Sequence, residues 1–220
     1  MNEYTLAIGD YAKSSWSMRA WLVLKAAGVA FDTVQVRLEQ PDTRAHILRY
    51  SPSGKVPALI LKDCVINDSL AIGETIAERF PQAGLWPRDA ILRAKARSAA
   101  AEMHSGFVSL RTQMPFGVST GERVDPVLPD TQSDLDRALQ VWSDLRAASG
   151  SMAFLCGEFG IVDAMFTPVI FRFRRFGIAI PDDLKAYADA VLSNRHVQEW
   201  LTLAQEELRA SPTISGLNAR

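Results

Sequence analysis

The sequence has few of the residues that build covalent or metal cross-links. It contains 2 cysteines and 3 histidines among 220 residues, and Cys64 and Cys156 are far apart and outside any CxxC spacing. Such a pair supports neither a disulfide framework nor a zinc knuckle. We therefore expect two free thiols, no bound metal, and a fold that depends on a hydrophobic core, for which 48% hydrophobic residues are available.

The sequence also lacks an excess of either charge and lacks long apolar runs. Its 24 Lys and Arg residues nearly balance its 25 Asp and Glu residues, so the net charge is -1 and the basic field that attracts nucleic acid is missing. The apolar runs are short and interrupted by charged residues, and residues 1–11 lack the pattern of a secretory signal. We expect a cytoplasmic protein with no nucleic-acid partner and no membrane contact.

The first 80 residues alternate between strand-like and helix-like patterns, and together they predict the order β-α-β-α-β-β-α. The first two strands, at 4–9 and 31–38, are separated by a helix that Gly28 ends, which is typical of a parallel βαβ unit. The other expected elements are a helix at 41–49, a β-hairpin at 58–68, and a helix that begins at Ser69 and stops at Pro81.

Strand signals almost vanish beyond residues 81–88, which form a connector that contains Pro and Gly. We therefore predict an α/β domain at 1–80, a linker at 81–88 and an all-helical domain at 89–220. The expected helices are at 89–114, 129–148, 161–176, 183–192 and 195–209, with a mobile loop at 117–130.

Ser14, Ser15 and Ser17 lie at a strand-to-helix junction in the stretch YAKSSWSMRAW. Ligands of α/β domains bind at the carboxyl ends of parallel strands, where helix N-termini present unpaired amides. The serines are therefore either a helix cap with solvated neighbours or hydroxyls that face a ligand.

Two further stretches allow a structural and a functional interpretation. Val56-Pro57 in GKVPAL comes directly before a strand, either as a cis element or as a trans proline that starts the strand. Asp68 and Ser69 in NDSLAI precede a helix, and they either cap it or bind an amino-acid-like ligand. In the second case Asp68 binds the ammonium group, and Ser69 with the helix amides binds the carboxylate.

Together these three stretches resemble the N-terminal domain of the cytosolic glutathione transferases, and the resemblance covers nearly the whole chain. It implies a thioredoxin-like domain followed by an all-helical domain, a homodimer, and glutathione as co-substrate. It also implies a cis Val56-Pro57 bond and a Ser hydroxyl that holds the glutathione sulfur. Ser14 is our first choice for that hydroxyl, with Ser15 and Ser17 second, and we expect the helix cap among the neighbours of Ser14.

The resemblance also assigns the rest of the glutathione site. Asp68 and Ser69 would hold the γ-glutamyl end, the backbone of Val56 would pair with the cysteinyl peptide, and Lys55 would reach the glycyl carboxylate. The small electrophile would lie in the cleft between the domains. We expect bulky side chains in the walls of that cleft, namely Trp16, Phe107, Met114, Phe116 and Phe171.

Within the family, SSWSMR is similar to the SSxSxR signature of the zeta class, the maleylacetoacetate isomerases. Trp16 stands at the position of the usual Cys, which contributes to the isomerase site in that class. AEMHSGFVSLR resembles the zeta segment that carries a His or Gln toward glutathione, here His104, with Arg111 one or two turns on. Arg175 in FRFRRFGI lies where that class carries an arginine for the substrate carboxylate.

The stretch FGIVDAMFTP resembles the family's capping element. Gly160 stands at the N-cap position and Asp163 three residues later, so the usual Ser or Thr of the cap is missing. We expect Asp163 to make its half of the reciprocal box and to be structural.

The sequence supports three alternative hypotheses about function. The first is a transferase that adds the glutathione thiolate to a small electrophile, and the second is a glutathione-dependent cis–trans isomerase. The third is a non-catalytic binding module, because fold alone does not determine function.

Overall fold

The computed structural model describes residues 2–151 and 153–210. Residues 211–220, which the sequence assigned to the helical domain, lie outside the described residues. In chain order the elements are β1 (Tyr4–Ile8), α1 (Ser15–Ala26), β2 (Phe31–Gln35), α2 (Thr43–Leu48), β3 (Ala58–Ile60), β4 (Val65–Asn67), α3 (Ser69–Arg79), the 3₁₀ helix η1 (Pro81–Ala83), α4 (Ala90–Ser105), α5 (Val108–Gln113), α6 (Pro129–Ser149), α7 (Ile161–Phe176), α8 (Asp182–Ser193) and α9 (Arg195–Ala210).

The four strands form one mixed sheet in the order β2-β1-β3-β4. β1 pairs in parallel with β2 and antiparallel with β3, and β3 and β4 form the antiparallel hairpin. The predicted β-α-β-α-β-β-α order is therefore confirmed, as is the thioredoxin-like α/β domain followed by a helical part. Leu6 and Ile8 of the central strand β1 are fully buried, because helices and other strands cover both faces of it.

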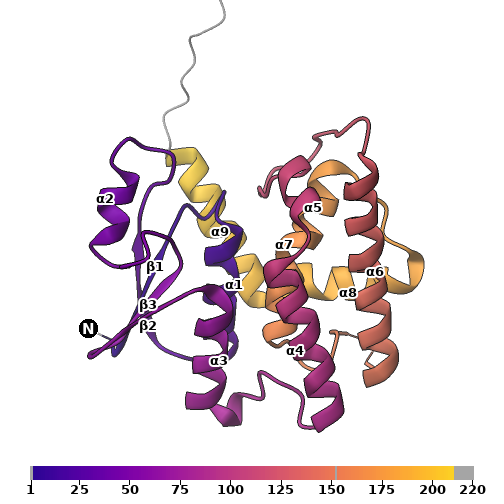
Figure 1. The fold of residues 1–220 in the computed structure, drawn as a ribbon, viewed down its shortest axis with the longest axis horizontal. Coiled ribbons are helices and arrows are strands. Elements are labelled where there is room, and N and C mark those ends of the chain that lie inside the picture. The colour runs from indigo at the N-terminus through magenta and orange to yellow at the C-terminus, as the bar shows by residue number, and fades with distance from the viewer. Residues whose placement is uncertain (1, 152, 211–220) are drawn as a thin grey trace, which may run out of the picture.

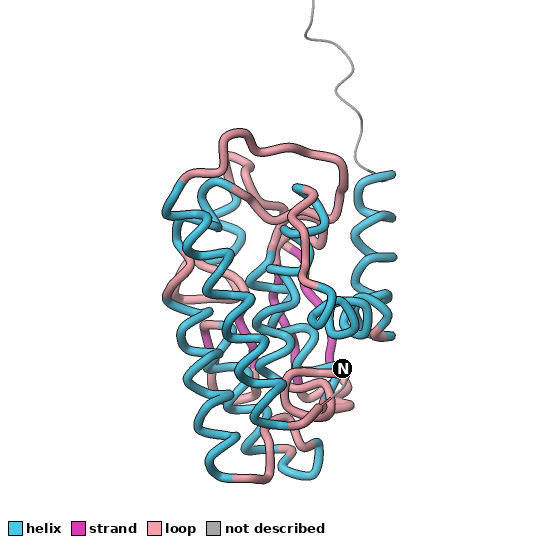
Figure 2. Tube along the Cα trace, turned by 90° about the vertical axis from the view of Figure 1, so that its right-hand side faces the viewer, coloured by secondary structure: helices cyan, strands magenta, loops and turns pink. Residues whose placement is uncertain are grey.

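Helices α1 and α3 lie between the sheet and the helical part, whereas α2 lies on the far side of the sheet (Figure 1). Helix α7 is the centre of the helical part, since nearly all of its residues are buried. In the view turned by 90° the long helices run alongside one another and the loops gather at their ends (Figure 2). No helix in the described part of the chain combines the length and the apolar character that crossing a membrane requires.

The last helix, α9, returns to the first domain and packs beside α1 (Figure 1). The indole Nε1 of Trp200 donates to the carbonyl oxygen of Tyr11 at 3.0 Å, and the Tyr11 N–H donates to the Glu207 carboxylate at 2.7 Å. The loop between β1 and α1 is thereby fixed from the helical side.

One predicted helix is wrong in its extent, because 89–114 is two helices rather than one. The chain turns at Gly106 and Phe107, where Phe107 has a left-handed φ of 57°. A Cβ on Gly106 would lie 2.9 Å from the carbonyl oxygen of Glu102. The Phe107 ring is buried and meets Phe166 edge-on at 6.3 Å between centroids, so burial of this ring outweighs the local helical pattern.

The start of α7 has the half capping box that the sequence predicted. Asp163 Oδ2 accepts the N–H of Gly160 and Oδ1 accepts the N–H of Leu155, both at 3.0 Å. Burial raises the pKa of the Asp163 carboxyl to about 7, although these N–H donors act in the opposite direction. A Cβ on Gly160 would lie 2.5 Å from the carbonyl oxygen of Leu85, which explains why no Ser or Thr occupies this cap.

We expect Gly160→Ser to destabilise the protein by about 1–3 kcal/mol, although it completes a capping box, because its Cβ would collide with backbone. The matched control is Gly73→Ala in α3, whose Cβ would meet Ile161 at an ordinary 3.5 Å. This control should gain up to about 1 kcal/mol from helix propensity. Chemical denaturation measures both, and a Gly160→Ser protein as stable as the unmodified one would contradict the steric argument.

Candidate functional site

The three serines at the start of α1 form part of a hydrogen-bonded chain. Ser14 Oγ accepts the N–H of Ser17 at 3.3 Å and donates to Ser17 Oγ at 2.8 Å, and Ser17 Oγ accepts the N–H of Gly9 at 3.0 Å. Ser14 is therefore itself the N-cap of α1. The expectation that the cap would fall to the neighbours of Ser14 is wrong, because the Ser14 side chain already meets the N–H of N3.

The first turn of α1 keeps donors that are not used within the fold. Among the described residues, no hydrogen bond is made by the hydroxyl of Ser15 or by the backbone N–H groups of Ser15 and Trp16. These N–H groups lie at the positive end of the helix dipole, so this turn can receive a negative charge.

The start of α3 is arranged in a similar way. Asp68, which has a φ of 81°, caps the helix through Oδ1, which accepts the N–H groups of Leu70 at 2.8 Å and Ala71 at 3.1 Å. Its second oxygen, Oδ2, lies 3.0 Å from Nε2 of His104 on α4. The hydroxyl of Ser69 is buried and has no hydrogen-bond partner, which is costly for a polar group unless a ligand supplies one.

A cavity of about 350 Å³ brings these elements together. Six of the residues that the sequence singled out line it, namely Trp16, Lys55, Val56, Asp68, Ser69 and His104. The cis peptide bond between Val56 and Pro57 also belongs to this wall, as the resemblance implied. Ser14, Ser15 and Ser17 are in the same turn as Trp16 but are not among the lining residues.

Ser53 and Asn67 line the cavity as well, although sequence analysis missed them. Ser51 Oγ links the two, at 2.9 Å from Ser53 Oγ and 2.8 Å from Asn67 Oδ1. Ser53 precedes the Val56-Pro57 element by three residues, but no spacing in the sequence relates it to Asn67, which comes from β4.

Trp16 forms the boundary between the cavity and the helical part. The Cζ atoms of Arg19 and Arg111 lie 4.4 and 4.7 Å from the centre of its ring, and the His104 ring meets it edge-on at 5.3 Å. Arg111 therefore lies beside the cavity without lining it. Arg19 was not singled out from the sequence, although it is the last residue of SSWSMR.

The other predicted residues lie elsewhere. Arg175 pairs with Glu122, whose carboxylate oxygen is 2.5 Å from Nη2, and thereby ties the loop before α6 to the end of α7. The side chains expected to line the cleft beside Trp16 are instead buried in the core, namely Phe107, Met114, Phe116 and Phe171.

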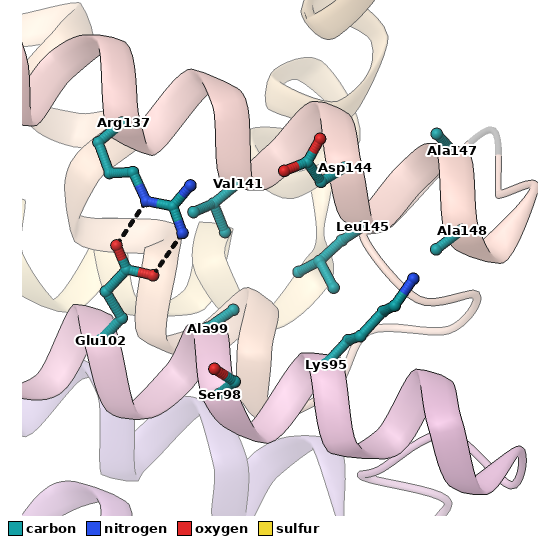
Figure 3. Close-up of a pocket in the computed structure, with 10 residues that line it drawn as sticks. All are labelled: Lys95, Ser98, Ala99, Glu102, Arg137, Val141, Asp144, Leu145, Ala147 and Ala148. Carbon is teal, nitrogen blue, oxygen red and sulfur yellow. Dashed lines mark hydrogen bonds and ion pairs between the residues drawn. The ribbon is translucent and has the colours of Figure 1, made fainter.

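A second, larger cavity of about 540 Å³ lies between α4 and α6 (Figure 3). Glu102 and Arg137 face each other across it in a two-pronged ion pair, with N–O distances of 2.6 and 2.8 Å. None of the residues predicted for the site lines this cavity. Within residues 2–151 and 153–210 there is no group of three His, Cys, Asp or Glu side chains placed to hold a metal ion.

Comparison with known proteins identifies one domain of the chain. Residues 13–79 match the family model of the glutathione S-transferase N-terminal domain. This part of the chain is a glutathione S-transferase N-terminal domain. The chain is 34% identical over 106 residues to glutathione S-transferase Z1 of Arabidopsis thaliana, covering 48% of each chain. Over 101 residues it is 34% identical to the "probable maleylacetoacetate isomerase" of Caenorhabditis elegans, covering 46% of this chain and 47% of that one. The alignments thus span about half the length of these zeta-class relatives.

Other relatives match over a longer range at lower identity. The stringent starvation protein A homolog of Histophilus somni is 26% identical over 77% of both chains. Among solved structures, a glutathione transferase homolog from Burkholderia gl BGR1 with bound glutathione has a TM-score of 0.70 at 23% identity, covering 94% of this chain and 99% of that one. A tau class glutathione S-transferase from mango, Mangifera indica, has a TM-score of 0.71 at 20% identity, covering 95% and 99%. These structures establish the fold.

The two residues that begin α3 should affect stability in opposite ways. Asp68→Ala should cost about 1 kcal/mol or more, because it removes the cap of α3. Ser69→Ala should cost nothing or stabilise the protein slightly, because it removes a buried hydroxyl that lacks a partner. Urea denaturation of both variants measures this difference. A Ser69→Ala protein that is much less stable would show that the hydroxyl has a partner in the folded protein.

Proposed function

We propose that the protein is a glutathione transferase that adds the thiolate of glutathione to a small electrophile. The observation that carries the proposal is the cavity in which the first turns of α1 and α3 meet, with unused donors on both. Glutathione has a carboxylate and an ammonium group at one end, a second carboxylate at the other, and a thiol between them.

The cavity has a counterpart for each end of that molecule. Asp68 offers a carboxylate to the ammonium group, and the Ser69 hydroxyl offers its free donor to the neighbouring carboxylate. Lys55 is exposed at the rim and suits the glycyl carboxylate, while the backbone of Val56 suits the peptide between them. His104 holds Asp68 Oδ2, so it orients the carboxylate that receives the ammonium group.

The thiol must be kept as thiolate near neutral pH, because the thiolate is the nucleophile. Its free pKa is about 8.5, and a decrease of about 2 units corresponds to about 2.7 kcal/mol in favour of the anion. A hydrogen bond to a charged group contributes roughly 1.5–3 kcal/mol, and a helix N-terminus roughly 0.3–1. One hydroxyl and the first turn of α1 are therefore sufficient.

Ser14 remains our first choice for the hydroxyl, and capping does not prevent this role. Its oxygen accepts the Ser17 N–H, so its own hydrogen is free to turn from Ser17 Oγ toward a sulfur. Ser17 Oγ could then donate to Ser14 Oγ while it still accepts the Gly9 N–H, and such a chain strengthens the last donor. Ser15 is the second choice, because its hydroxyl has no partner among the described residues.

We expect Ser14→Ala to lower kcat/KM for conjugation by about 10–100-fold, the loss that corresponds to one hydrogen bond to an anion. Ser15→Ala should lower it less, and Ser98→Ala in the other cavity should leave it unchanged. Conjugation rates with a panel of small electrophiles measure these effects, with denaturation curves to separate loss of the α1 cap from loss of the donor. A larger loss with Ser15→Ala would move the role to Ser15.

A second candidate function is glutathione-dependent cis–trans isomerisation, which the 34% identity to a maleylacetoacetate isomerase favours. Arg175, the arginine expected for the substrate carboxylate, is paired with Glu122, and Trp16 replaces the cysteine of that class. Isomerisation of maleylacetone by the purified protein would establish this activity. Glutathione binding in calorimetry without either reaction would leave a binding module. Resemblance to the glutathione transferases is also the basis for proposing a homodimer in the cytoplasm, which sedimentation and cell fractionation test.

A further inference from the structure

We infer that Arg19 and Arg111 act together as positioning residues that stabilise negative charge in the cavity, and with it the thiolate form of bound glutathione. The inference rests on the proposed function and adds a source of charge stabilisation besides the serine hydroxyl. It is carried by the buried guanidinium group of Arg19 and the half-buried one of Arg111, which contact the ring of Trp16 beside the cavity. Among the described residues neither forms an ion pair with a carboxylate.

Arg19 is a buried cation without an anion. Its side chain is 1% exposed, and no ion pair joins it to a carboxylate among the described residues. Its Nε donates to the carbonyl oxygen of Met165 at 3.0 Å and Nη2 to the sulfur of Met103 at 3.3 Å, while Nη1 is buried without any partner. Burial and the nearby Arg111 and Arg172 lower the pKa of Arg19 well below its usual value, although the Asp68 carboxylate acts in the opposite direction.

Arg111 reaches the same place from α5. Its guanidinium donates to the carbonyl oxygens of Met103 and His104 at the end of α4, while Nε is buried without a partner. Carbonyl oxygens at a helix C-terminus carry only partial negative charge. Burial lowers the pKa of Arg111, and the carboxylate of Asp134, which accepts the Leu110 N–H, acts in the opposite direction.

The charged groups that face the cavity do not remove this excess. Asp68 is the only carboxylate among the lining residues, so the lining supplies one negative charge against the two guanidinium groups behind Trp16. Lys55 adds a further positive charge at the rim. The pair of guanidinium groups behind Trp16 therefore favours a ligand with negative charge. A thiolate adds such a charge to the two carboxylates that glutathione already carries.

A structural role for Arg111 would be to hold the end of α4 through its hydrogen bonds to the carbonyl oxygens of Met103 and His104. Variants of Arg111 can separate this structural role from the electrostatic role, because the electrostatic role requires only the positive charge. Arg111→Lys keeps the charge but loses the planar fork, whereas Arg111→Met keeps much of the length and loses the charge. Arg19 is too deeply buried for a clean test, because its replacement would disturb the core between α1, α4 and α7.

Arg172 provides a matched control. It is also buried, donates to the carbonyl oxygens of Met114 at 2.8 Å and Pro168 at 3.1 Å, and has a pKa lowered by burial to about 9. Its Cζ lies 5.8 Å from the ring of Phe116, not against Trp16, so it is one side chain further from the cavity. Arg172→Met should therefore affect folding without the same effect on the ligand.

The experiment follows the ultraviolet absorbance of the thiolate in the complex of the purified protein with glutathione as a function of pH. S-methylglutathione, which has no thiol, reports binding separately by calorimetry. We expect Arg111→Met to raise the pKa of the bound thiol by about one unit, which is about tenfold less thiolate at a pH below it. Arg111→Lys should restore most of this shift, and Arg172→Met should leave the thiol pKa unchanged.

The outcomes separate the inference from the proposed function. If Arg111→Met binds S-methylglutathione and its bound thiol has the pKa of the unmodified complex, the inference is wrong and the proposed function stands. An equal shift in Arg172→Met, or no recovery in Arg111→Lys, would also overturn it, because the effect would then be structural. If the unmodified protein binds neither compound, the proposed function fails and the inference with it.

Discussion

The buried carboxylate of Asp163 is the interaction on which the arrangement of the site depends. It holds Leu155 and Gly160 by their N–H groups and so fixes where α7 begins. Helix α7 is the main partner of α1 in the helical part, and its Met165 carbonyl accepts from Arg19 on α1. Both α1 and α4, which carries His104, pack on α7, so the start of α7 bears on how these two helices are placed relative to each other.

The same buried end of α7 also joins the two parts of the chain. The carbonyl oxygen of Leu85 accepts the Ile161 N–H at 3.1 Å and lies where a side chain at Gly160 would begin. A backbone hydrogen bond thus joins the connector to the start of α7. A Ser or Thr, the usual residue at this N-cap, is incompatible with the close approach of the Leu85 carbonyl oxygen to Gly160. The absence of a capping hydroxyl therefore reflects a packing constraint.

Both helix starts at the cavity use one polar side chain as a cap and leave other donors unused. Ser14 caps α1 and leaves the amides of Ser15 and Trp16 unused, and Asp68 caps α3 and leaves the Ser69 hydroxyl without a partner. A buried hydroxyl without a partner lowers stability, and it is retained here where two helix N-termini meet one cavity. This division explains why capping and ligand binding, which looked like competing interpretations in the sequence, coexist.

The sequence predicted most of what depends on local pattern. Periodicity and turn residues identified the strands, the hairpin and most of the helices. They also placed the serines at the start of α1 at the carboxyl ends of the parallel strands, whereas Asp68 was assigned to the same site by resemblance to the family. The sequence did not predict the turn at Phe107, which depends on burial of a ring against Phe166, or the link between Ser53 and Asn67. These depend on contacts between elements that no spacing in the chain encodes.

Trp16 is the residue whose meaning changes most between sequence and structure. In the sequence it marks a departure from the zeta signature, where a thiol is expected, and it is one of the bulky side chains expected in the wall of the cleft. In the structure its ring contacts two guanidinium groups and the His104 ring while it lines the cavity. A cysteine would leave those cations without a π surface to lie against. The tryptophan therefore gives one buried and one half-buried guanidinium group a ring to lie against next to the cavity, an arrangement that supports the inferred role of these two arginines.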